Sequence, residues 1–388
     1  LFTKLDSVSG ISIAKTDAHL KSYESGSTDD VQAMYPVRIY ANGSVDGKKI
    51  EWARSLNTSK GSMTVGEAKD LISISETIQE RLRKGDQSLI LPVVAYYGTG
   101  RLWDNHREKR GETLQKNSRT NGYIDCLDGT ASIKLMMSWF KNMTIKKYQR
   151  QERGLGPVPE LEAVYQAIRT CLTSITGYSN IDVGYNLDID ELDIFYTDAS
   201  NLCMRIPLSQ MSAGYKGTIS LIADIAYRMA ALNPQLLDRV LTETDGVVLI
   251  DEIDLHLHPQ WQKLILLDLT EIFPKVQFIV TTHAPAVINS AYSENLVILK
   301  DSQIMTASSQ VYGKDVKSVL TEIMGVDDRP DQVSHMFKAF YKALDNRDFD
   351  DAEHVLNQLD ELREYHDVEV ASCRVKLKME KIRGGGGK

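Results

Sequence analysis

The stretch Val247–Pro259, which reads VVLIDEIDLHLHP, decides the fold prediction for this chain. Its apolar residues run directly into Asp251 and Glu252, as they do where a buried parallel strand ends at the edge of a sheet. Nucleotide hydrolysis uses one carboxylate near a magnesium ion and a second that orients or deprotonates the attacking water. Two acids in this position can instead begin an ordinary polar loop, so the dipeptide alone leaves both interpretations open.

Length and composition indicate an ordinary globular protein. The chain has 388 residues, of which 42% are hydrophobic, enough for one large domain or a few lobes. Its formal net charge of -8 argues against a nucleic-acid binder that uses the whole surface. The 4 cysteines form no CxxC pair, which predicts neither a zinc ribbon nor a disulfide framework and favours a cytoplasmic location. No apolar run approaches the ~18 residues of a membrane helix.

The segments around the opening stretch predict a strand–helix–strand unit with parallel strands. The strand at Val247–Ile250 is followed by a helix at Pro259–Phe273 and a strand at Val276–Thr281. A further buried strand is predicted at Ser88–Tyr97, and a hairpin turn at Gly43–Lys48. Shorter strands are predicted at 181–185 and 192–196, and helices at 65–84, 129–176, 215–232 and 314–382.

Two more segments have the residues of a nucleotide site. Ser212 and Gly214 stand at the start of a predicted helix, where free backbone N–H groups and the positive dipole end suit a γ-phosphate. His283 ends the strand after the acidic one, where it can sense a phosphate or hold the attacking water. Taken alone, Ser212 is better explained as an N-cap, and His283 as a polar strand end. The order and spacing of the three segments favour the nucleotide site.

Together these segments resemble the second half of an ATP-binding-cassette-type ATPase head, the group shared by chromosome-maintenance and recombination-repair proteins. The resemblance implies ATP and Mg²⁺ as cofactors, with Asp251 at the metal and Glu252 and His283 as catalytic residues. Asp251 and Glu252 correspond to Walker B, and His283 corresponds to the switch histidine. The residues implied to contact the nucleotide are Ser212, Ala213 and Gly214 of the signature motif and Asp254 of the D-loop.

The segment Val93–Trp103 and the DLHLHP loop are most similar to the bacterial ATPases of Septu and retron-associated anti-phage systems. These resemble a group once labelled virulence-associated ATP-binding proteins. Within this segment we assign a nucleotide contact to Arg101 and leave the charged run that follows it undecided. His256 and His258 form an HxH pattern known from metalloenzymes, but no third ligand is nearby, so a D-loop is the preferred interpretation.

The phosphate-binding loop that such a site requires, GxxxxGK followed by Ser or Thr, does not occur in these residues. Gly43–Lys48 is the nearest string, but it has too few residues between its glycines and reads as a hairpin turn. The resemblance places the loop on a first βα unit, upstream of Leu1. We expect that unit to be missing from the chain as given; the alternative is a degenerate protein that cannot grip ATP.

The predicted fold is α/β: an ABC-type P-loop ATPase head, in which a mixed sheet has an antiparallel β lobe, with a helical insertion and a helical C-terminal region. The predicted parts are an N-terminal ATPase lobe at 1–128, the insertion at 129–180, the signature and Walker B lobe at 181–312, helices at 313–383 and a flexible glycine tail at 384–388.

The resemblance implies an ATPase that acts as the sensor or regulatory subunit of an anti-phage complex. It would form a homodimer around ATP and control an HNH endonuclease, with a reverse transcriptase and retron DNA as further partners, nucleic acid reached through the complex, and no membrane. The acidic residues at 345–351 lie in a helix–turn–helix pattern, so we expect no intrinsic nuclease domain. The alternatives are a chromosome-maintenance or repair-like ATPase, an overcoming-lysogenization-defect-type ATPase without its nuclease, and a nucleotide-blind scaffold.

The apolar stripes of the C-terminal helices are a candidate surface for docking that partner. They lie at Val333–Leu344 and Asp351–Leu362, and the alternative is that they are simply core.

Overall fold

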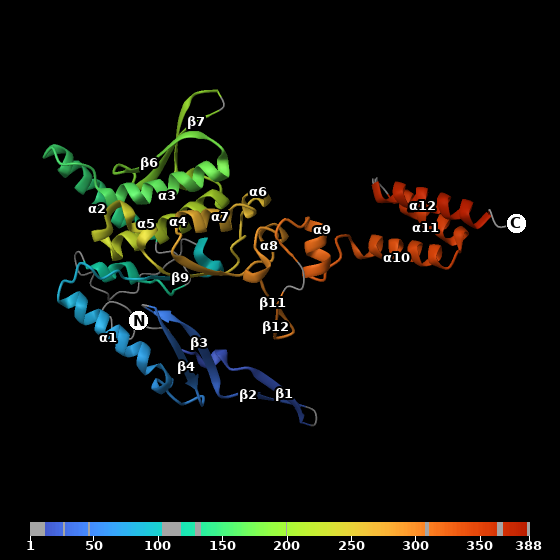
Figure 1. Ribbon diagram of the computed structural model, residues 1–388, viewed down its shortest axis with the longest axis horizontal. Helices are drawn as coiled ribbons and strands as arrows, with labels where there is room; N and C mark the ends of the chain where they lie inside the picture. The colour runs from blue at the N-terminus through green and yellow to red at the C-terminus, as the bar shows by residue number, and fades with distance from the viewer. Residues whose placement is uncertain are drawn as a thin grey trace. The chain divides into compact units, whose positions relative to one another are not determined.

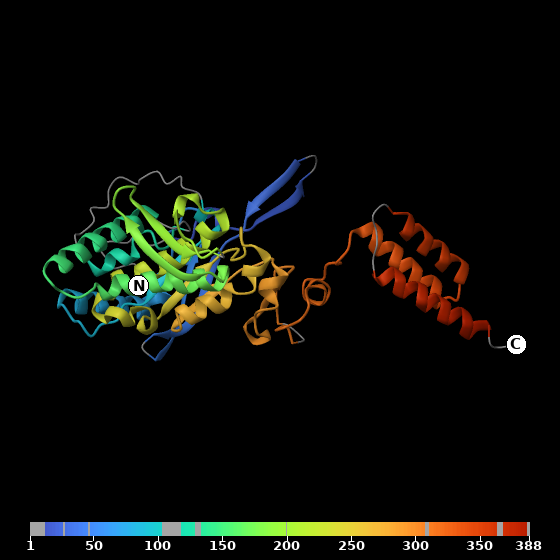
Figure 2. The same cartoon turned by 90° about the horizontal axis from the view of Figure 1, so that it is seen from above.

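The computed structural model (Figures 1 and 2) describes residues 12–25, 28–45, 47–102, 118–128, 133–198, 200–306, 310–362 and 368–385. The chain divides into two compact units, Leu1–Val287 and Ile288–Lys388, which are described separately. Among the described residues, none of the helices combines the length and the apolar content required to cross a bilayer.

A parallel sheet of three strands lies at the centre of the first unit (Figure 1). It consists of β5 (Val93–Tyr97), β9 (Gly246–Ile250) and β10 (Val276–Val280), in the order β10-β9-β5. Both pairings are parallel and in register along all of β9, which confirms the predicted parallel strands. The connection between β9 and β10 contains α6 (Pro259–Gln262) and α7 (Ile265–Ile272), where the sequence predicts one continuous helix.

The two faces of this sheet differ in burial. Val93, Ala95 and Tyr97 of β5 are buried, together with Val248 and Ile250 of β9, and α4 (Ala213–Leu232) packs against β5 on its apolar residues. The opposite face has a row of three side chains that are in register across the strands and exposed. These are Tyr96 at 37%, Leu249 at 38% and Ile279 at 51% exposure. Parallel sheets are normally covered on both faces, so this row is unusual.

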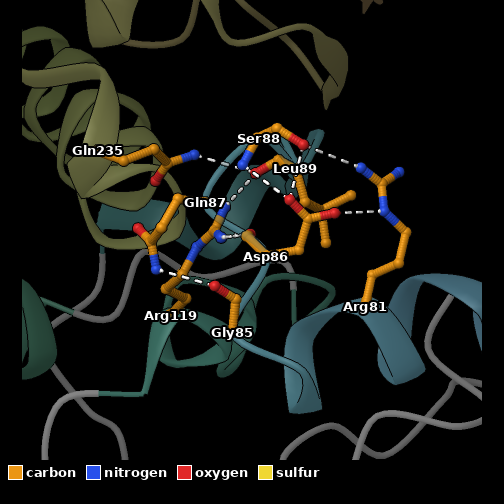
Figure 3. Close-up of polar contacts among 8 residues, drawn as sticks. All are labelled: Arg81, Gly85, Asp86, Gln87, Ser88, Leu89, Arg119 and Gln235. Atoms are coloured by element: carbon orange, nitrogen blue, oxygen red, sulfur yellow. Dashed lines mark hydrogen bonds and ion pairs between the residues drawn. The ribbon is translucent and has the colours of Figure 1, made fainter.

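The strand predicted to begin at Ser88 starts only at Val93, because side chains occupy the backbone groups that precede it. Asn233 accepts a hydrogen bond from the Leu91 N–H and donates one to the Leu91 carbonyl, each 2.8 Å long. Pro92 has no N–H to give to a neighbouring strand. The turn before it is fixed in the same way, since Arg119 and Gln235 both donate to the Leu89 carbonyl (Figure 3).

Helices and an antiparallel sheet build the rest of this unit. α3 (Pro159–Thr176) packs on α4, and the buried side chains of both helices belong to the main core. The antiparallel sheet consists of β6 (Ser179–Asn186), β7 (Glu191–Thr197) and β8 (Cys203–Pro207), of which the sequence predicted the first two. The other elements are β1 (Leu20–Ser25), β2 (Thr28–Ala33), β3 (Val37–Val45), β4 (Lys48–Leu56), α1 (Lys69–Arg83), α2 (Ile133–Glu152), α5 (Val240–Glu243) and α8 (Pro285–Ile288).

The predicted hairpin is confirmed, but its strands are longer than expected, because β3 and β4 pair antiparallel through Gly43 and Ser44 up to Val45 opposite Lys48. That string is therefore no phosphate-binding loop.

The second unit is mainly helical, and three of its helices lie side by side (Figure 2). They are α10 (Asp331–Asp345), α11 (Phe349–Glu361) and α12 (Val368–Gly385), and they share a core of their own. The unit also contains the hairpin of β11 (Val297–Lys300) and β12 (Gln303–Thr306), the short helix α9 (Val316–Ser318) and a π-helical turn at Val319–Ile323.

Candidate nucleotide site

The acidic residues and the predicted histidine lie at the same edge of the parallel sheet. The Asp251 N–H donates to the Tyr97 carbonyl at the end of β5, at 2.8 Å. On the other side, the Thr281 N–H donates to the Ile250 carbonyl at 3.0 Å, so β10 ends beside β9. His283 is exposed and lies two residues beyond Thr281. The strand ends therefore bring Asp251, Glu252 and His283 to one side of the sheet.

Thr281 holds both acidic residues in place. Its hydroxyl donates to Asp251 Oδ1 and accepts a hydrogen bond from the Glu252 N–H at 2.9 Å. Glu252 has φ of 47°, in the left-handed region that a residue with a side chain rarely adopts. Strained residues of this kind cluster at functional sites, where the surrounding contacts hold them. The contact with Thr281 is such a constraint on Glu252.

Thr282 holds the next acidic residue in a similar way. Its hydroxyl donates to Asp254 Oδ1 and accepts from the Ala284 N–H at 3.0 Å. The two threonines thus connect the loop after β9 to the segment that presents His283. The sequence shows them just before His283, but a threonine pair at a strand end gives no separate signal of these partners.

The start of α4 meets the same loop. Gly214 is buried, and a Cβ atom built on it would lie 2.6 Å from the His256 carbonyl oxygen and 3.1 Å from Trp261 Cζ3. The rings of Tyr215 and Trp261 are 4.3 Å apart, centroid to centroid. Gly214 therefore allows the first turn of α4 to approach the backbone of the loop after β9.

Ser212 occupies the N-cap position of α4, but its side chain makes no capping hydrogen bond, and Ser212 and Ala213 are both exposed. The first N–H groups of any α-helix lack partners within the helix. These two residues thus present the positive end of a 20-residue helix at the surface.

Replacing Gly214 by alanine tests the contact between α4 and the loop. The added Cβ has no room beside the His256 carbonyl, so we expect the free energy of unfolding to fall by about 1–3 kcal/mol, as in other overpacked sites. Urea denaturation of the purified protein measures this. The control is Gly66→Ala, where nothing lies within 4 Å of the added Cβ. Equal unfolding free energies for both variants would contradict the close approach.

The histidines of the HxH pattern, His256 and His258, belong to no cluster of possible metal ligands in the part of the chain that the structure describes. His258 Nδ1 accepts a hydrogen bond from the Gln260 N–H at 3.3 Å and caps α6, and His256 is exposed with φ of 61°. Within the described ranges, no group of three or more His, Cys, Asp or Glu side chains is close enough to hold a metal ion.

The remaining predicted site residue, Arg101, has its backbone in a short 3₁₀ turn at Thr99–Leu102, two residues beyond the end of β5. Its side chain, like the charged run after it, lies outside the described residues.

A buried network of polar side chains connects α4 to β5. Asp224 and Arg228 are 0% and 1% exposed, and Arg228 Nε donates to Asp224 Oδ2 at 2.7 Å. Tyr97 donates to the same oxygen at 2.6 Å, while Arg228 Nη1 donates to the carbonyls of Gly122 and Ile124, each at 2.9 Å. Since the Tyr97 carbonyl accepts the Asp251 N–H, this network connects α4 to the acidic strand end.

The charges in this network are fixed by their surroundings. Burial, together with the negative charge of Asp224, raises the pKa of Tyr97 well above its usual value, so the phenol stays neutral and donates. Burial opposes the charge on Arg228 most strongly, but the charge and hydrogen bond of Asp224 together with the neighbouring Tyr97 and Tyr227 outweigh burial and hold the guanidinium pKa well above its usual value. The sequence signal that was missed is this pair, spaced i,i+4 in an otherwise apolar helix.

In a comparison with known families, the same part of the chain matches an AAA domain. Residues 205–289 match the family described as "AAA domain, putative AbiEii toxin, Type IV TA system". The match contains the start of α4, β9, the loop after it and His283.

Three curated relatives agree with this match. A "Retron Vc95 probable ATPase" of Vibrio cholerae is 27% identical over 68% of this chain and 59% of its own length. A "Retron Ec83 probable ATPase" of Escherichia coli is 40% identical over 40% of this chain and 27% of its own. The "Septu protein PtuA" of Bacillus thuringiensis is 31% identical over 40% of this chain and 41% of its own. The chain thus spans less than two thirds of each of these relatives.

A solved structure from work on SMC ATPases has 20% sequence identity over 38% of this chain, with a TM-score of 0.26.

The fold is mixed α/β, and residues 205–289 within it match an AAA-domain family. The chain is related to the ATPases of the Septu and retron systems, as its sequence motifs predicted.

Proposed function

We propose that this protein is the ATP-binding and ATP-hydrolysing regulatory subunit of a bacterial anti-phage complex of the Septu or retron type. Two copies dimerise around ATP and Mg²⁺ in the cytoplasm and control a partner HNH endonuclease, while hydrolysis resets the dimer. A reverse transcriptase and its retron DNA are further members of the proposed complex. The printed names of the relatives support the setting, and the arrangement of the sheet edge supports the chemistry.

The observation that carries this proposal is the link between the exposed start of α4 and the acidic loop. Gly214 packs on the His256 carbonyl, while Ser212 and Ala213 stay exposed at the helix N-terminus. A helix N-terminus binds phosphate through its free N–H groups and its dipole. The exposed N-terminus of α4 can bind a nucleotide held by a second copy. The contact of Gly214 with the loop after β9 then couples this binding to the position of Glu252.

The residues at the sheet edge fit a nucleotide with its metal. Mg²⁺ in such sites keeps several waters and binds one or two carboxylates together with the phosphates, and it neutralises the charge that develops on them. Asp251, which is half-buried and fixed by Thr281, would hold the hydrated ion. Glu252 would orient the attacking water and take its proton, and the exposed His283 would contact the γ-phosphate.

This function also requires a phosphate-binding loop, and no GxxxxGK[ST] string occurs in the 388 residues. We include in the proposal a further βα unit that supplies the loop and covers the open sheet face. The row of Tyr96, Leu249 and Ile279 supports it, because parallel sheets bury such side chains under a helix.

ATP-dependent dimerisation of the full-length protein tests the proposal. We expect the mass in solution to double when a non-hydrolysable ATP analogue and Mg²⁺ are added, as measured by light scattering. Ser212→Arg places a long cation at the exposed helix start, where it blocks the second copy's nucleotide but not folding, since Ser212 makes no capping bond. The variant should therefore stay monomeric and still bind ATP.

The matched control is Ser73→Arg, an exposed serine on α1. It should dimerise like the unchanged protein. A mass that does not respond to nucleotide, or a Ser212→Arg variant that dimerises normally, would overturn the proposed arrangement.

A further inference from the structure

The α12 helix of the second unit has two apolar stripes, and only one of them is buried. Val370, Cys373 and Leu377 face the core that α12 shares with α10 and α11. A second set of apolar residues recurs at spacings of three and four on the opposite side of the helix, and all of them are exposed. This outer stripe consists of Val368, Ala371, Val375, Met379 and Ile382.

The exposure of the outer stripe is high for apolar side chains. Val368 is 84% exposed, Val375 53%, Met379 58% and Ile382 75%. By contrast, the stripes of α10 and α11 that the sequence suggested for docking lie in the unit's own core, for instance Phe340 at 0% and Leu356 at 1% exposure. Among these three helices, the apolar stripe that is exposed to a partner is therefore on α12, and the sequence patterns did not single it out.

The shape of the outer stripe fits another helix. Residues at i, i+3, i+7, i+11 and i+14 form a narrow seam like that between paired helices. A helix that lies in a membrane surface instead has a broad apolar face, with Trp, Phe or Leu in it. The outer stripe contains none of these residues, and the far side of α12 is already packed on its neighbours.

The charges beside the outer stripe select the partner. Lys376 and Arg383 flank it on one side and Lys378 on the other, as the helical spacing places them. Of the other cations of α12, Arg374 and Lys381 pair with Asp360 and Glu353 of α11, and Arg383 pairs with Glu380, so Lys376 and Lys378 are the main basic residues of the border. A basic border around an apolar seam is complementary to an acidic border on the partner.

The outer stripe of α12 is poorly suited to bind α12 of a second copy of this chain. Two outer stripes packed together, parallel or antiparallel, would bring Lys376 and Lys378 of one copy against those of the other. The exposed residues of α10 and α11 are mostly polar, for instance Lys338 and Asp360, and form no matching apolar seam among the described residues. None of the helices α10, α11 and α12 of a second copy therefore matches the outer stripe, which favours a different protein as the partner.

We propose that the outer stripe of α12 docks an amphipathic helix of a partner protein whose apolar seam is bordered by Asp and Glu. This inference goes beyond the proposed ATPase function, and its test needs no nucleotide, so either can fail without the other.

The test uses two designed helical peptides of about three heptads with Leu at the seam positions. One has Glu at the bordering positions and the other has Lys. Fluorescence anisotropy with the full-length protein measures their binding. We expect the Glu peptide to bind at least about tenfold more tightly than the Lys peptide, and this preference to shrink at high salt.

The double variant Val375→Glu with Met379→Glu places two charges in the seam and should weaken binding of the Glu peptide at least about tenfold. The matched control, Ala339→Glu with Asn357→Glu, adds the same charge at exposed positions of α10 and α11. It should bind the peptide nearly as well as the unchanged protein. Circular dichroism checks that all the variants keep their helices.

Four outcomes would overturn the proposal. The two peptides could bind equally, neither could bind, or the control could lose as much affinity as the seam variant. The fourth is binding of the protein to phosphatidylserine vesicles that the seam variant abolishes and the control variant keeps, which would make the outer stripe a membrane contact.

Discussion

Replacing Arg228 by methionine is expected to lower the free energy of unfolding by about 3–5 kcal/mol, among the largest effects of a single change in this protein. The buried Asp224 carboxylate would lose its only cation and keep a single hydrogen bond from Tyr97 among the contacts described. The carbonyls of Gly122 and Ile124 would lose their donor as well. Urea denaturation followed by tryptophan fluorescence and circular dichroism measures the loss.

The chain offers a matched control in Arg239, which pairs with Glu243 at the same i,i+4 spacing and is 63% exposed. Arg239→Met should cost less than about 1 kcal/mol, because exposed pairs contribute little. Replacing Asp224 by leucine together with Arg228→Met should recover part of the loss, since no charge is then left buried. If Arg228→Met and Arg239→Met lower the free energy of unfolding by similar amounts, burial does not determine how much the Asp224–Arg228 pair contributes to stability.

Local pattern was enough to predict the central part of the fold. The apolar runs of β9 and β10 and the helix between them predict parallel strands, and the long apolar periodicity predicts α4. These elements are recognisable because each one buries a face that its own sequence defines. The α/β class and the edge that holds Asp251, Glu252 and His283 follow from them.

Contacts between distant parts of the chain could not be predicted in this way. The strand expected from Ser88 is shortened because Asn233, 142 residues from Leu91 along the chain, binds the Leu91 backbone. β8 was missed because Cys203–Pro207 has no apolar alternation, and its pairing with β7 includes an ion pair of Arg205 with the buried Asp193. Local sequence contains neither partner.

In the candidate site too, the sequence predicts where the residues lie but not which contacts hold them. Sequence order places the acids, His283 and the helix start near one sheet edge. The hydroxyl contacts of Thr281 and the packing of Gly214 on the His256 carbonyl depend on the folded backbone. The resemblance implies that Gly214 contacts the nucleotide, and the folded chain adds that this buried glycine lets the first turn of α4 approach the loop after β9.

Glu252→Gln is expected to lower ATP turnover by about 10²–10⁴-fold, the usual contribution of a general base, while ATP-dependent dimerisation persists. The amide keeps the size of the side chain but cannot take a proton from water. The strained backbone should be retained, because Thr281 holds the N–H of residue 252 and not its side chain. Phosphate release under saturating ATP measures turnover, and light scattering measures the dimer.

The contrast between turnover and dimerisation decides the role of Glu252. A glutamate that takes a proton acts only in the transition state, so its loss leaves nucleotide binding intact and prolongs the ATP-bound dimer. A glutamate that only supports the loop after β9 would lower both quantities together, and that result would contradict the assignment. Glu271→Gln, an exposed glutamate on α7 away from the sheet edge, should change neither quantity. If ATP turnover is lost and the dimer persists in Glu252→Gln, while Glu271→Gln changes neither, the water-activating role belongs to Glu252.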